Sequence, residues 1–548
     1  MSAADLTTAS GVLGIELGST RIKLCLVAAD DPSTILGTGA HEWQNQYLDG
    51  VWTYALDDVW SGLQSAYADL VANLGSAPTS LAGIGISAMM HGYLAFDGSG
   101  ELLVPFRTWR NTSTGEAAAE LTELLGVNIP LRWSIAHLQQ AVRDAEPHLA
   151  EIRSLNTLAG YVHQKLTGRH VLGVGDASGM FPIDPATGDY DDELVGRYDR
   201  FVADTPLTGS LRELLPEVLL AGQPAGTLTA EGAALLDPSG SLQPGAPLCP
   251  PEGDAGTGMV ATNAIAARTG NISAGTSIFA MVVMERPLQK VHHEIDVVTT
   301  PTGAPVAMVH CNNGTSELAE WAGLFGRFAD ATGSPLDTDA VYGALFAEAL
   351  EGEADAGGLL AYNLLAGEPI AGLPEGRPLV VRGPESRFTL ANFMRAQLYG
   401  VFGTLSIGMQ VLADEGVELD AMSAHGGMFR TAGVAQRLLA GALNAPVTVA
   451  TTASEGGAWG MAVLAAFAAQ ADLPGTSPDL ASTDLASTGL SDTGLSDTGL
   501  SDYLRERVFA GADTDTVRPD PQDVAGFAAY LTRYRAGLEV ERAAIAAV

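Results

Sequence analysis

Residues 14–27 read GIELGSTRIKLCLV, and this stretch decides the fold. An apolar run at 11–17 precedes a Gly-Ser-Thr turn at 18–20, and residues 21–26 then alternate polar and apolar side chains. Such alternation is typical of a half-buried strand. The stretch therefore predicts a β-hairpin whose turn is made of small residues.

A second stretch of the same kind lies about half the chain later. Residues 271–283 read NISAGTSIFAMVV, which again predicts a strand, a Gly-Thr-Ser turn and a strand. Two halves that each begin with such a hairpin favour a duplicated α/β domain. The alternative is two unrelated hairpins, because Gly, Ser and Thr are common turn residues.

The rest of the chain alternates short apolar strands with Ala- and Leu-rich helical stretches. Residues 56–74 predict a helix, 83–87 a strand and 524–547 a C-terminal helix. This alternation predicts an α/β protein, and 548 residues allow two large domains or three of medium size. Residues 479–503 form pentads of Ser, Thr, Asp, Gly and Leu whose period fits neither helix nor strand, so we expect a disordered surface insert there.

The composition excludes several classes of partner. The chain has 28 Lys and Arg against 64 Asp and Glu, a net charge of -36, which repels phosphate backbones and anionic lipids. We therefore expect no nucleic-acid and no membrane partner. The longest apolar stretch, 398–413, is interrupted by polar residues and is too short to span a bilayer.

The cysteines and the N-terminus indicate the compartment. Cys25, Cys249 and Cys311 are widely spaced and form no CxxC pair, which favours a reducing environment. The first ten residues lack the basic and apolar regions of a signal peptide. We expect a soluble, cytoplasmic protein.

The two small-residue turns are candidate phosphate sites. Backbone N–H groups and hydroxyls in such a turn bind phosphate oxygens without a lysine, and this chain has only three lysines. Two such turns from two domains would hold a polyphosphate between them.

Asp254 is the candidate catalytic base. It lies in PEGDAGTG, where a Gly-rich loop meets a helix that we expect to continue to about Arg268, with Gly270 as its C-cap. A general base at a helix start is one interpretation of Asp254. The other is an ordinary N-cap, since Asp is a preferred residue there.

Two further segments suit a sugar. ISAMMHGYLAFD (86–97) places Met90 and His91 at the end of a strand, where sulfur packs on C–H faces and imidazole bonds to hydroxyls. FRTWRNTST (106–114) offers the aromatic plate of Trp109 and the amide of Asn111. On local grounds a structural histidine and an ordinary loop remain open alternatives.

The Gly-Gly turn in AHGGMFRTAGVAQRLLAGALNAPVTV (424–449) would let a flat purine lie against backbone. A tight connection between a strand and a helix is the alternative. His292 and His293 have no ligand partners at metal spacing, and we expect them on the surface.

The order of these motifs is more specific than any one of them. The hairpin is followed by MHG near 90, W-x-N near 110, LTG near 167 and GDAS near 176. GD-x-G near 254, S-x-GTS near 275 and HGG near 426 come next. In this order the chain resembles the FGGY carbohydrate kinases over residues 11–470 and the C-terminal helix.

The resemblance implies two RNase H-like domains of the actin/hexokinase/Hsp70 superfamily flanking a catalytic cleft. It assigns the sugar site, the first phosphate loop and the catalytic aspartate to 11–268, and the nucleotide to 269–548. ATP and Mg²⁺ would be the cofactors, and homodimers are common in the family. The residues that match family motifs are Gly18, Ser19, Thr20, Gly275, Thr276 and Ser277 for the phosphates, Gly426, Gly427 and Met428 for adenosine, Asp254 for catalysis, and Met90, His91, Trp109 and Asn111 for the sugar.

Three departures bear on the metal and the substrate. Position 16 is Glu where the family usually has Asp, Asn111 replaces the usual Asp, and Ser113 stands where xylulokinases place Arg. Glu16 and Asp254 are the carboxylates that would hold Mg²⁺ through water. MMHG resembles xylulokinases and the basic residue after Trp109 resembles ribulokinases, so the expected substrate is a ketopentose, D-xylulose or L-ribulose.

Two alternatives stay open. One is an FGGY kinase for another keto-sugar or polyol. The other, from a different class, is a non-catalytic actin-like scaffold or sugar sensor, which would not need Asp254 together with sugar-side residues.

Overall fold

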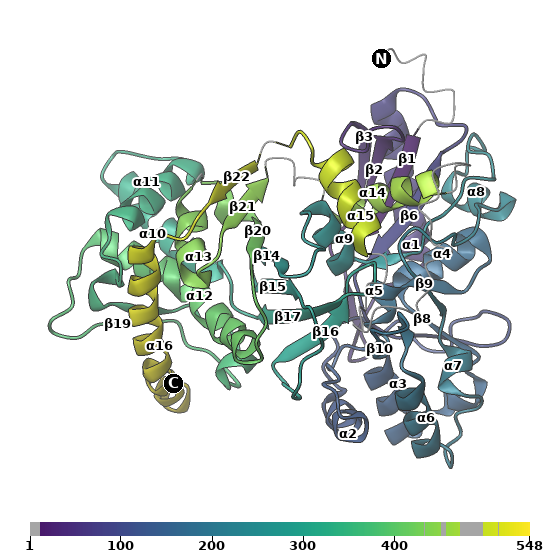
Figure 1. Ribbon diagram of the computed structural model, residues 1–548, viewed down its shortest axis with the longest axis horizontal. Helices are drawn as coiled ribbons and strands as arrows, with labels where there is room; N and C mark the ends of the chain where they lie inside the picture. The colour runs from purple at the N-terminus through teal and green to yellow at the C-terminus, as the bar shows by residue number, and fades with distance from the viewer. Residues whose placement is uncertain (1–10, 432, 451–455, 472–496, 513) are drawn as a thin grey trace, which may run out of the picture. The chain divides into compact units, whose positions relative to one another are not determined.

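The computed structural model describes residues 11–431, 433–450, 456–471, 497–512 and 514–548. The chain divides into two compact units with interleaved segments (Figure 1). Unit 1 comprises Met1–Ala266, Val297–Pro305 and Ser454–Ala512, and unit 2 comprises Ala267–Asp296, Val306–Ala453 and Asp513–Val548. The first change of unit lies two residues before the expected boundary at 268. The expectation of one boundary, however, did not include the return of the chain to unit 1 at 297–305 and 454–512.

Unit 1 is built on a five-stranded sheet. The predicted hairpin is present as β1 and β2, with β3 antiparallel to β2 on one side and β6 parallel to β1 on the other. The order is β13-β6-β1-β2-β3, with bounds β1 Gly11–Leu17, β2 Arg21–Ala28, β3 Ile35–Glu42, β6 Gly83–Ala88 and β13 Glu252–Gly253. Its apolar face forms a continuous core with α1 and α4.

Unit 2 repeats this topology. A hairpin of β14 and β15 is flanked by antiparallel β17 and by parallel β20 and β21. The edge strands are β22 and β16, and most of β16 falls in the segment 297–305 that is counted in unit 1. The bounds are β14 Thr269–Ala274, β15 Ile278–Val283, β16 Ile295–Thr299, β17 Pro305–Cys311, β20 Ala421–His425, β21 Val447–Ala450 and β22 Thr514–Val517. The shared order, three antiparallel strands followed by two parallel ones, is the RNase H-like arrangement that was predicted, and it favours duplication over two unrelated hairpins.

Helices surround the two sheets. Those of unit 1 are α1 Leu56–Leu74, α2 Gly115–Leu125, α3 Ser134–Arg143, α4 Leu158–Thr167, α5 Val174–Ala177, α6 Asp192–Phe201, α7 Leu211–Leu214, α8 Ala230–Leu236, α9 Asp254–Ala261, α14 Gly456–Ala471 and α15 Asp497–Tyr503. Those of unit 2 are α10 Ser316–Ala331, α11 Thr338–Glu351, α12 Leu390–Asp414, α13 Val434–Leu443 and α16 Pro521–Ala547. Short two-stranded pairs lie outside the main sheets. They are β4 Gln46–Leu48 with β5 Val51–Thr53, β7 Leu94–Phe96 with β8 Ser154–Asn156, β9 Val171–Gly173 with β12 Glu217–Leu219, β10 Ile183–Asp184 with β11 Asp189–Tyr190, and β18 Leu360–Tyr362 with β19 Leu379–Val381.

Helix α14 joins unit 1 because its backbone approaches the sheet closely. A Cβ on Gly14 in β1 would lie 2.0 Å from the carbonyl oxygen of Ala458, and one on Gly85 in β6 would lie 2.8 Å from that of Met461. Glycine is therefore required where the helix crosses these strands. This long-range contact brings a segment from late in the chain against the N-terminal hairpin.

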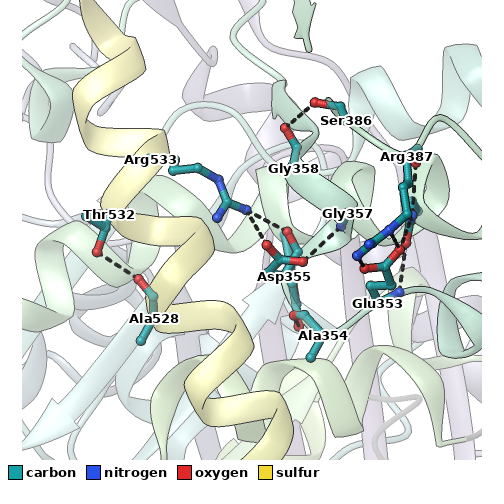
Figure 2. A network of polar contacts seen from close by, with 12 residues as sticks. Glu353, Ala354, Asp355, Gly357, Gly358, Ser386, Arg387, Ala528, Thr532 and Arg533 are labelled. Atoms are coloured by element: carbon teal, nitrogen blue, oxygen red, sulfur yellow. Dashed lines mark hydrogen bonds and ion pairs between the residues drawn. The ribbon is translucent and has the colours of Figure 1, made fainter. Parts of the chain in front are cut away.

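Helix α16 is fixed in unit 2 by a polar network (Figure 2). Arg533 of α16 donates to the carbonyl oxygen of Asp355 (2.8 Å) and pairs with its carboxylate (3.1 Å). The same carboxylate accepts from the N–H of Gly357 (3.1 Å) and so shapes the turn between α11 and β18. Glu353, nearby, pairs with Arg387. The predicted C-terminal helix is thus confirmed as part of unit 2.

Helix α12 is the core helix of unit 2. Among the described helices it is the one long and apolar enough to cross a bilayer, but 72% of its most apolar window is buried inside the protein. Burial of that kind is expected of a core helix and does not indicate a membrane span.

Two local expectations are corrected. Helix α9 ends at Ala261 rather than near Arg268, because Asn263 and Arg268 both adopt positive φ (53° and 66°), so Gly270 lies in β14 and is no C-cap. The insert expected to be disordered at 479–503 is helical at Asp497–Tyr503, where Leu500 and Tyr503 are buried. Residues 479–496 lie outside the described residues.

Candidate functional site

The first turn, Gly18–Thr20, has its carbonyl groups bound by aromatic residues. Trp43 donates its indole N–H to the carbonyl of Gly18 (2.7 Å) and its backbone N–H to that of Thr20 (3.2 Å). The hydroxyl of Tyr54 donates to the carbonyl of Ser19 (2.6 Å). The Trp43 and Tyr54 rings stack at 4.3 Å and form a rigid support behind the turn.

The second turn, Gly275–Ser277, is held in the same way by backbone. Gly314 donates its N–H to the carbonyl of Thr276 (2.8 Å), and Thr315 donates its N–H and hydroxyl to that of Gly275 (2.8 and 2.9 Å). Within the described residues, no hydrogen bond engages the N–H groups of Ser19, Thr20, Thr276 or Ser277. With their carbonyls bound to protein, both turns can offer N–H groups to an anion.

The predicted adenosine motif lies next to the second turn. Strands β14 and β20 are parallel neighbours, and His425 pairs with Ser273. The Gly426-Gly427 turn and the second phosphate turn therefore follow their strands at the same end of the sheet. Gly426 has φ 114°, and a Cβ there would lie 2.2 Å from the carbonyl of Ala274. Gly426 and Gly427 are exposed and Met428 is buried. Glycine at 426 is therefore required by the close approach of Ala274, and Gly427 leaves exposed backbone beside the second turn.

Asp254 and the Met90-His91 pair are brought together in unit 1. Asp254 is the first residue of α9 rather than its cap, and its Oδ1 accepts the backbone N–H of Met90 (3.2 Å). Burial chiefly, with Glu16 adding repulsion, raises the pKa of Asp254 to about 6. A carboxylate that ionises near pH 6 suits a general base at neutral pH.

His91 is held in a strained, buried position. Its φ is 70°, its ring stacks on Trp133 with 17° between the planes, and Nδ1 lies 3.4 Å from the carbonyl oxygen of Gly179. Burial, followed by the nearby Arg132, holds the pKa of His91 well below its usual range. The imidazole is therefore neutral and can both donate and accept a hydrogen bond.

The structure divides the roles of Trp109 and Asn111. Trp109 is 38% exposed and available for stacking. Asn111 is buried, and its amide exchanges two hydrogen bonds with the backbone of Trp52 (2.8 and 2.9 Å) and donates a third to the carbonyl of Thr108. Asn111 therefore fixes the loop that presents Trp109, and Arg110 lies over the Trp52 ring at 4.4 Å.

Glu16 lies at the end of β1, where three elements meet. Its Oε2 accepts from Lys23 Nζ (3.1 Å) and from the N–H of Ala458 in α14 (3.3 Å). No cluster of three or more metal-ligating side chains is present in the described part of the chain. Glu16 and Asp254 supply hard oxygen donors that fit Mg²⁺ when water and phosphate complete its coordination.

Behind Asp254 lies a pair of buried carboxyl groups that the sequence analysis did not single out. Glu252 accepts the N–H groups of Gly175 (3.4 Å) and Asp176 (3.0 Å), and the hydroxyl of Thr157 donates to Asp176 Oδ2 (2.6 Å). Burial, reinforced by mutual repulsion, raises the pKa of Glu252 to about 8, and burial with repulsion from Asp254 raises that of Asp176 to about 7. The GDAS motif contained Asp176, but nothing local marked it as a partner of Glu252.

His292 is also less isolated than expected. It is partly buried, and its Nε2 lies 2.8 Å from Glu415 Oε1, a hydrogen bond that links two loops of unit 2.

Comparison with known families agrees with this arrangement. Residues 11–239 match the N-terminal domain of the FGGY family of carbohydrate kinases, and residues 270–469 match the C-terminal domain of that family. The chain belongs to the FGGY family. The resemblance expected from the motif order is thereby confirmed, and with it the class of sugar kinase that uses ATP.

Two relatives among curated proteins are both named xylulose kinases. The xylulose kinase of Haemophilus influenzae is 22% identical over 76% of this chain and 82% of its own. The xylulose kinase of Lactococcus lactis is 25% identical, but the match spans only 40% of this chain and 43% of that one.

Solved structures share the whole fold. A xylulose kinase from Brucella ovis superposes with a TM-score of 0.74 at 20% identity, covering 96% of this chain and 98% of its own. A gluconate kinase from Lactobacillus acidophilus gives 0.73 at 17% identity over 96% and 97%. Plasmodium falciparum glycerol kinase gives 0.71 at 14% over 95% and 97%. At these identities the likeness shows the two-unit fold and leaves the substrate open.

The buried carboxyl pair makes a testable prediction about stability. A carboxyl group whose pKa is raised by folding favours the folded state while protonated and opposes it once ionised. Since Asp176 and Glu252 ionise near pH 7 and 8, the melting temperature should fall by several degrees from pH 6 to about pH 8 and level off by pH 9. Asp176→Asn keeps an oxygen for Thr157 and should flatten this decline.

The control is Asp204→Asn, which removes one charge from an exposed position in the same unit. Differential scanning calorimetry at pH 6, 7.5 and 9 would compare the three proteins. A decline in Asp176→Asn as steep as in the wild type would show that Asp176 does not carry the effect.

Proposed function

We propose that this FGGY protein is an ATP- and Mg²⁺-dependent kinase that phosphorylates the terminal hydroxyl of a ketopentose, D-xylulose or L-ribulose. The observation that carries the proposal is the contact of Asp254 with Met90, which joins a carboxylate of suitable basicity to the Met-His pair. Among the relatives compared, those named xylulose kinases support a ketopentose. The free, buried cysteines suit a cytoplasmic enzyme.

Phosphoryl transfer requires positioning and charge neutralisation more than covalent chemistry. Asp254 would accept the proton of the sugar's terminal hydroxyl. The hydroxyl oxygen would form a bond to the γ-phosphorus, while the bond between the γ-phosphorus and the bridging oxygen of ADP breaks. The neutral imidazole of His91 would bond to a sugar hydroxyl, and Met90 and Trp109 would pack on C–H faces. These contacts orient the acceptor toward the phosphate.

The two turns would bind phosphate oxygens through the N–H groups of Ser19, Thr20, Thr276 and Ser277, and the nucleoside would lie along Gly426, Gly427 and Met428. When bound, Mg²⁺ neutralises phosphate charge, and Glu16 and Asp254 would hold it through water. Lys23, paired with Glu16, is an additional cation close to the first turn.

The substrate is tested by coupled ADP release with Mg-ATP across L-ribulose, D-xylulose, D-ribulose, L-xylulose, D-tagatose, gluconate, glycerol and erythritol. Strong turnover on D-xylulose or L-ribulose is the expected result. Preference for gluconate or glycerol would keep the kinase class and reject the ketopentose. ATP binding without turnover on any of them would favour the non-catalytic sensor.

The role of Asp254 is tested by Asp254→Asn on the best substrate of that panel. The amide oxygen can still accept the Met90 N–H, so binding should persist, whereas kcat should fall by about 10²–10⁴-fold because the base is lost. Asp204→Asn, exposed and in the same unit, is the matched control. If Asp254→Asn retained a tenth of wild-type kcat with unchanged KM values, another residue would have to be the base.

A further inference from the structure

The loop that supports the second turn lies too close to it for any side chain larger than hydrogen. A Cβ on Gly314 would lie 2.3 Å from the carbonyl oxygen of Gly275 and 2.7 Å from that of Ser277. Together with the hydrogen bonds from Gly314 and Thr315, this contact couples the position of the second turn to the position of residues 313–315. We call these residues the support loop.

The support loop is anchored by the side chain of Asn313, which is 4% exposed. Its Oδ1 accepts the N–H groups of Leu365 (2.8 Å) and Ala366 (2.9 Å). Its Nδ2 donates to Glu368 Oε2 and to the carbonyl of Ala366, both at 3.1 Å. Two donors and two acceptor sites are all that an amide has, so Asn313 is completely satisfied.

Glu368 and Asn363 complete the anchor. Glu368 is fully buried, and its Oε2 also accepts the backbone N–H of Asn313 (3.3 Å). Asn363 donates to the carbonyls of Asn313 (3.1 Å) and Gly314 (2.8 Å). The support loop is therefore held through its backbone and through its one amide side chain.

Stability alone does not account for this anchor. Burying a carboxyl group is costly, and Glu368 Oε1 has no hydrogen-bond partner among the described residues. Apolar residues in place of both Glu368 and Asn313 would avoid that cost. A polar network of this kind does fix one geometry, because each member accepts only correctly placed partners.

The geometry that it fixes matters for an anion. If the support loop shifted, the carbonyls of Gly275 and Thr276 would lose their donors and the Gly275–Thr276 peptide could rotate. Rotation would direct a carbonyl oxygen, in place of an N–H, toward the ligand and convert attraction into repulsion.

We propose that Asn313, anchored by Glu368, is a positioning residue for nucleotide phosphate, which keeps the N–H groups of the Gly275–Ser277 turn directed at the ligand. This inference rests on the proposed phosphate role of that turn. Asn313 acts through the support loop and does not itself contact the nucleotide.

The test measures ADP affinity directly, by titration calorimetry without sugar. In Asn313→Asp a carboxylate oxygen replaces Nδ2 opposite Glu368 Oε2, so two hydrogen bonds are lost and two acids face each other. We expect ADP to bind at least tenfold more weakly. The double variant Asn313→Asp/Glu368→Gln restores a donor opposite the new carboxylate, but the backbone N–H of residue 313 and the carbonyl of Ala366 still lose their partners. ADP affinity should therefore recover in part, by threefold or more over the single variant.

Asn312→Asp is the matched control, since it is the same change one residue earlier, at an exposed side chain whose one hydrogen bond within the described part of the chain is to the carbonyl of Gly367. A melting curve establishes that each variant is folded. If Asn313→Asp is not folded, Asn363→Ala removes the two bonds to the support-loop carbonyls and should weaken ADP by threefold or more.

The inference is overturned if a folded Asn313→Asp, or Asn363→Ala in its place, binds ADP within twofold of the wild type. It is also overturned if the double variant stays as weak as the single one. Failure of the proposed function is seen in a different measurement. If the wild type turns over no sugar but Asn313→Asp still binds ADP more weakly than the wild type, the inference stands and the proposed kinase activity is rejected.

Discussion

The carbonyl groups of the two glycine turns are bound by the protein itself, and the proposed chemistry depends on this constraint. Trp43 and Tyr54 hold the first turn, and Gly314 and Thr315 hold the second. The first turn is held mainly by aromatic side chains and the second mainly by backbone N–H groups. In both, the N–H groups of the last two turn residues, Ser19 and Thr20 or Thr276 and Ser277, have no partner among the described residues. A hairpin turn held in this way suits the proposed phosphate site, because these N–H donors remain to be satisfied.

This device suits a strongly acidic protein. With a net charge of -36 and three lysines, the chain has few cations to place at a polyphosphate. Lys23, the lysine nearest the first turn, is shared with Glu16 at 3.1 Å. Backbone donors carry no net charge, and they need no side-chain partner to hold them in place. In the proposed mechanism Asp254 then interacts with the acceptor hydroxyl and the metal while it keeps the Met90 N–H.

Local patterns in the sequence predicted the parts of the structure that depend on local signals. Hairpins with Gly-Ser-Thr turns, the helix at 56–74, and Gly426 after a strand all follow from residue type and spacing. The FGGY motif order then supplied the two-unit fold. The sequence did not predict the features that depend on contacts between residues far apart in the chain. The return of α14 to β1 depends on Gly14 meeting Ala458, more than 400 residues away.

The same reason explains the residues that the sequence analysis missed. Trp43 and Tyr54 lie outside any motif, and their function is visible only when their rings stack behind Gly18. Asn313 and Glu368 are 55 residues apart, and neither neighbourhood is unusual by itself. Asn111 was noticed for its amide, but that amide is occupied by Trp52, a pairing across 59 residues. Residue type marks a polar group, whereas the structure decides which partner it has.

The most direct test of the central claim is a crystal structure of the protein with ADP and Mg²⁺. The account predicts phosphate oxygens within hydrogen-bond distance of the N–H groups of Thr276 and Ser277, with the carbonyls of Gly275 and Thr276 still bound to residues 314 and 315. ADP phosphates held by side chains elsewhere, with these N–H groups bound only to water, would contradict it.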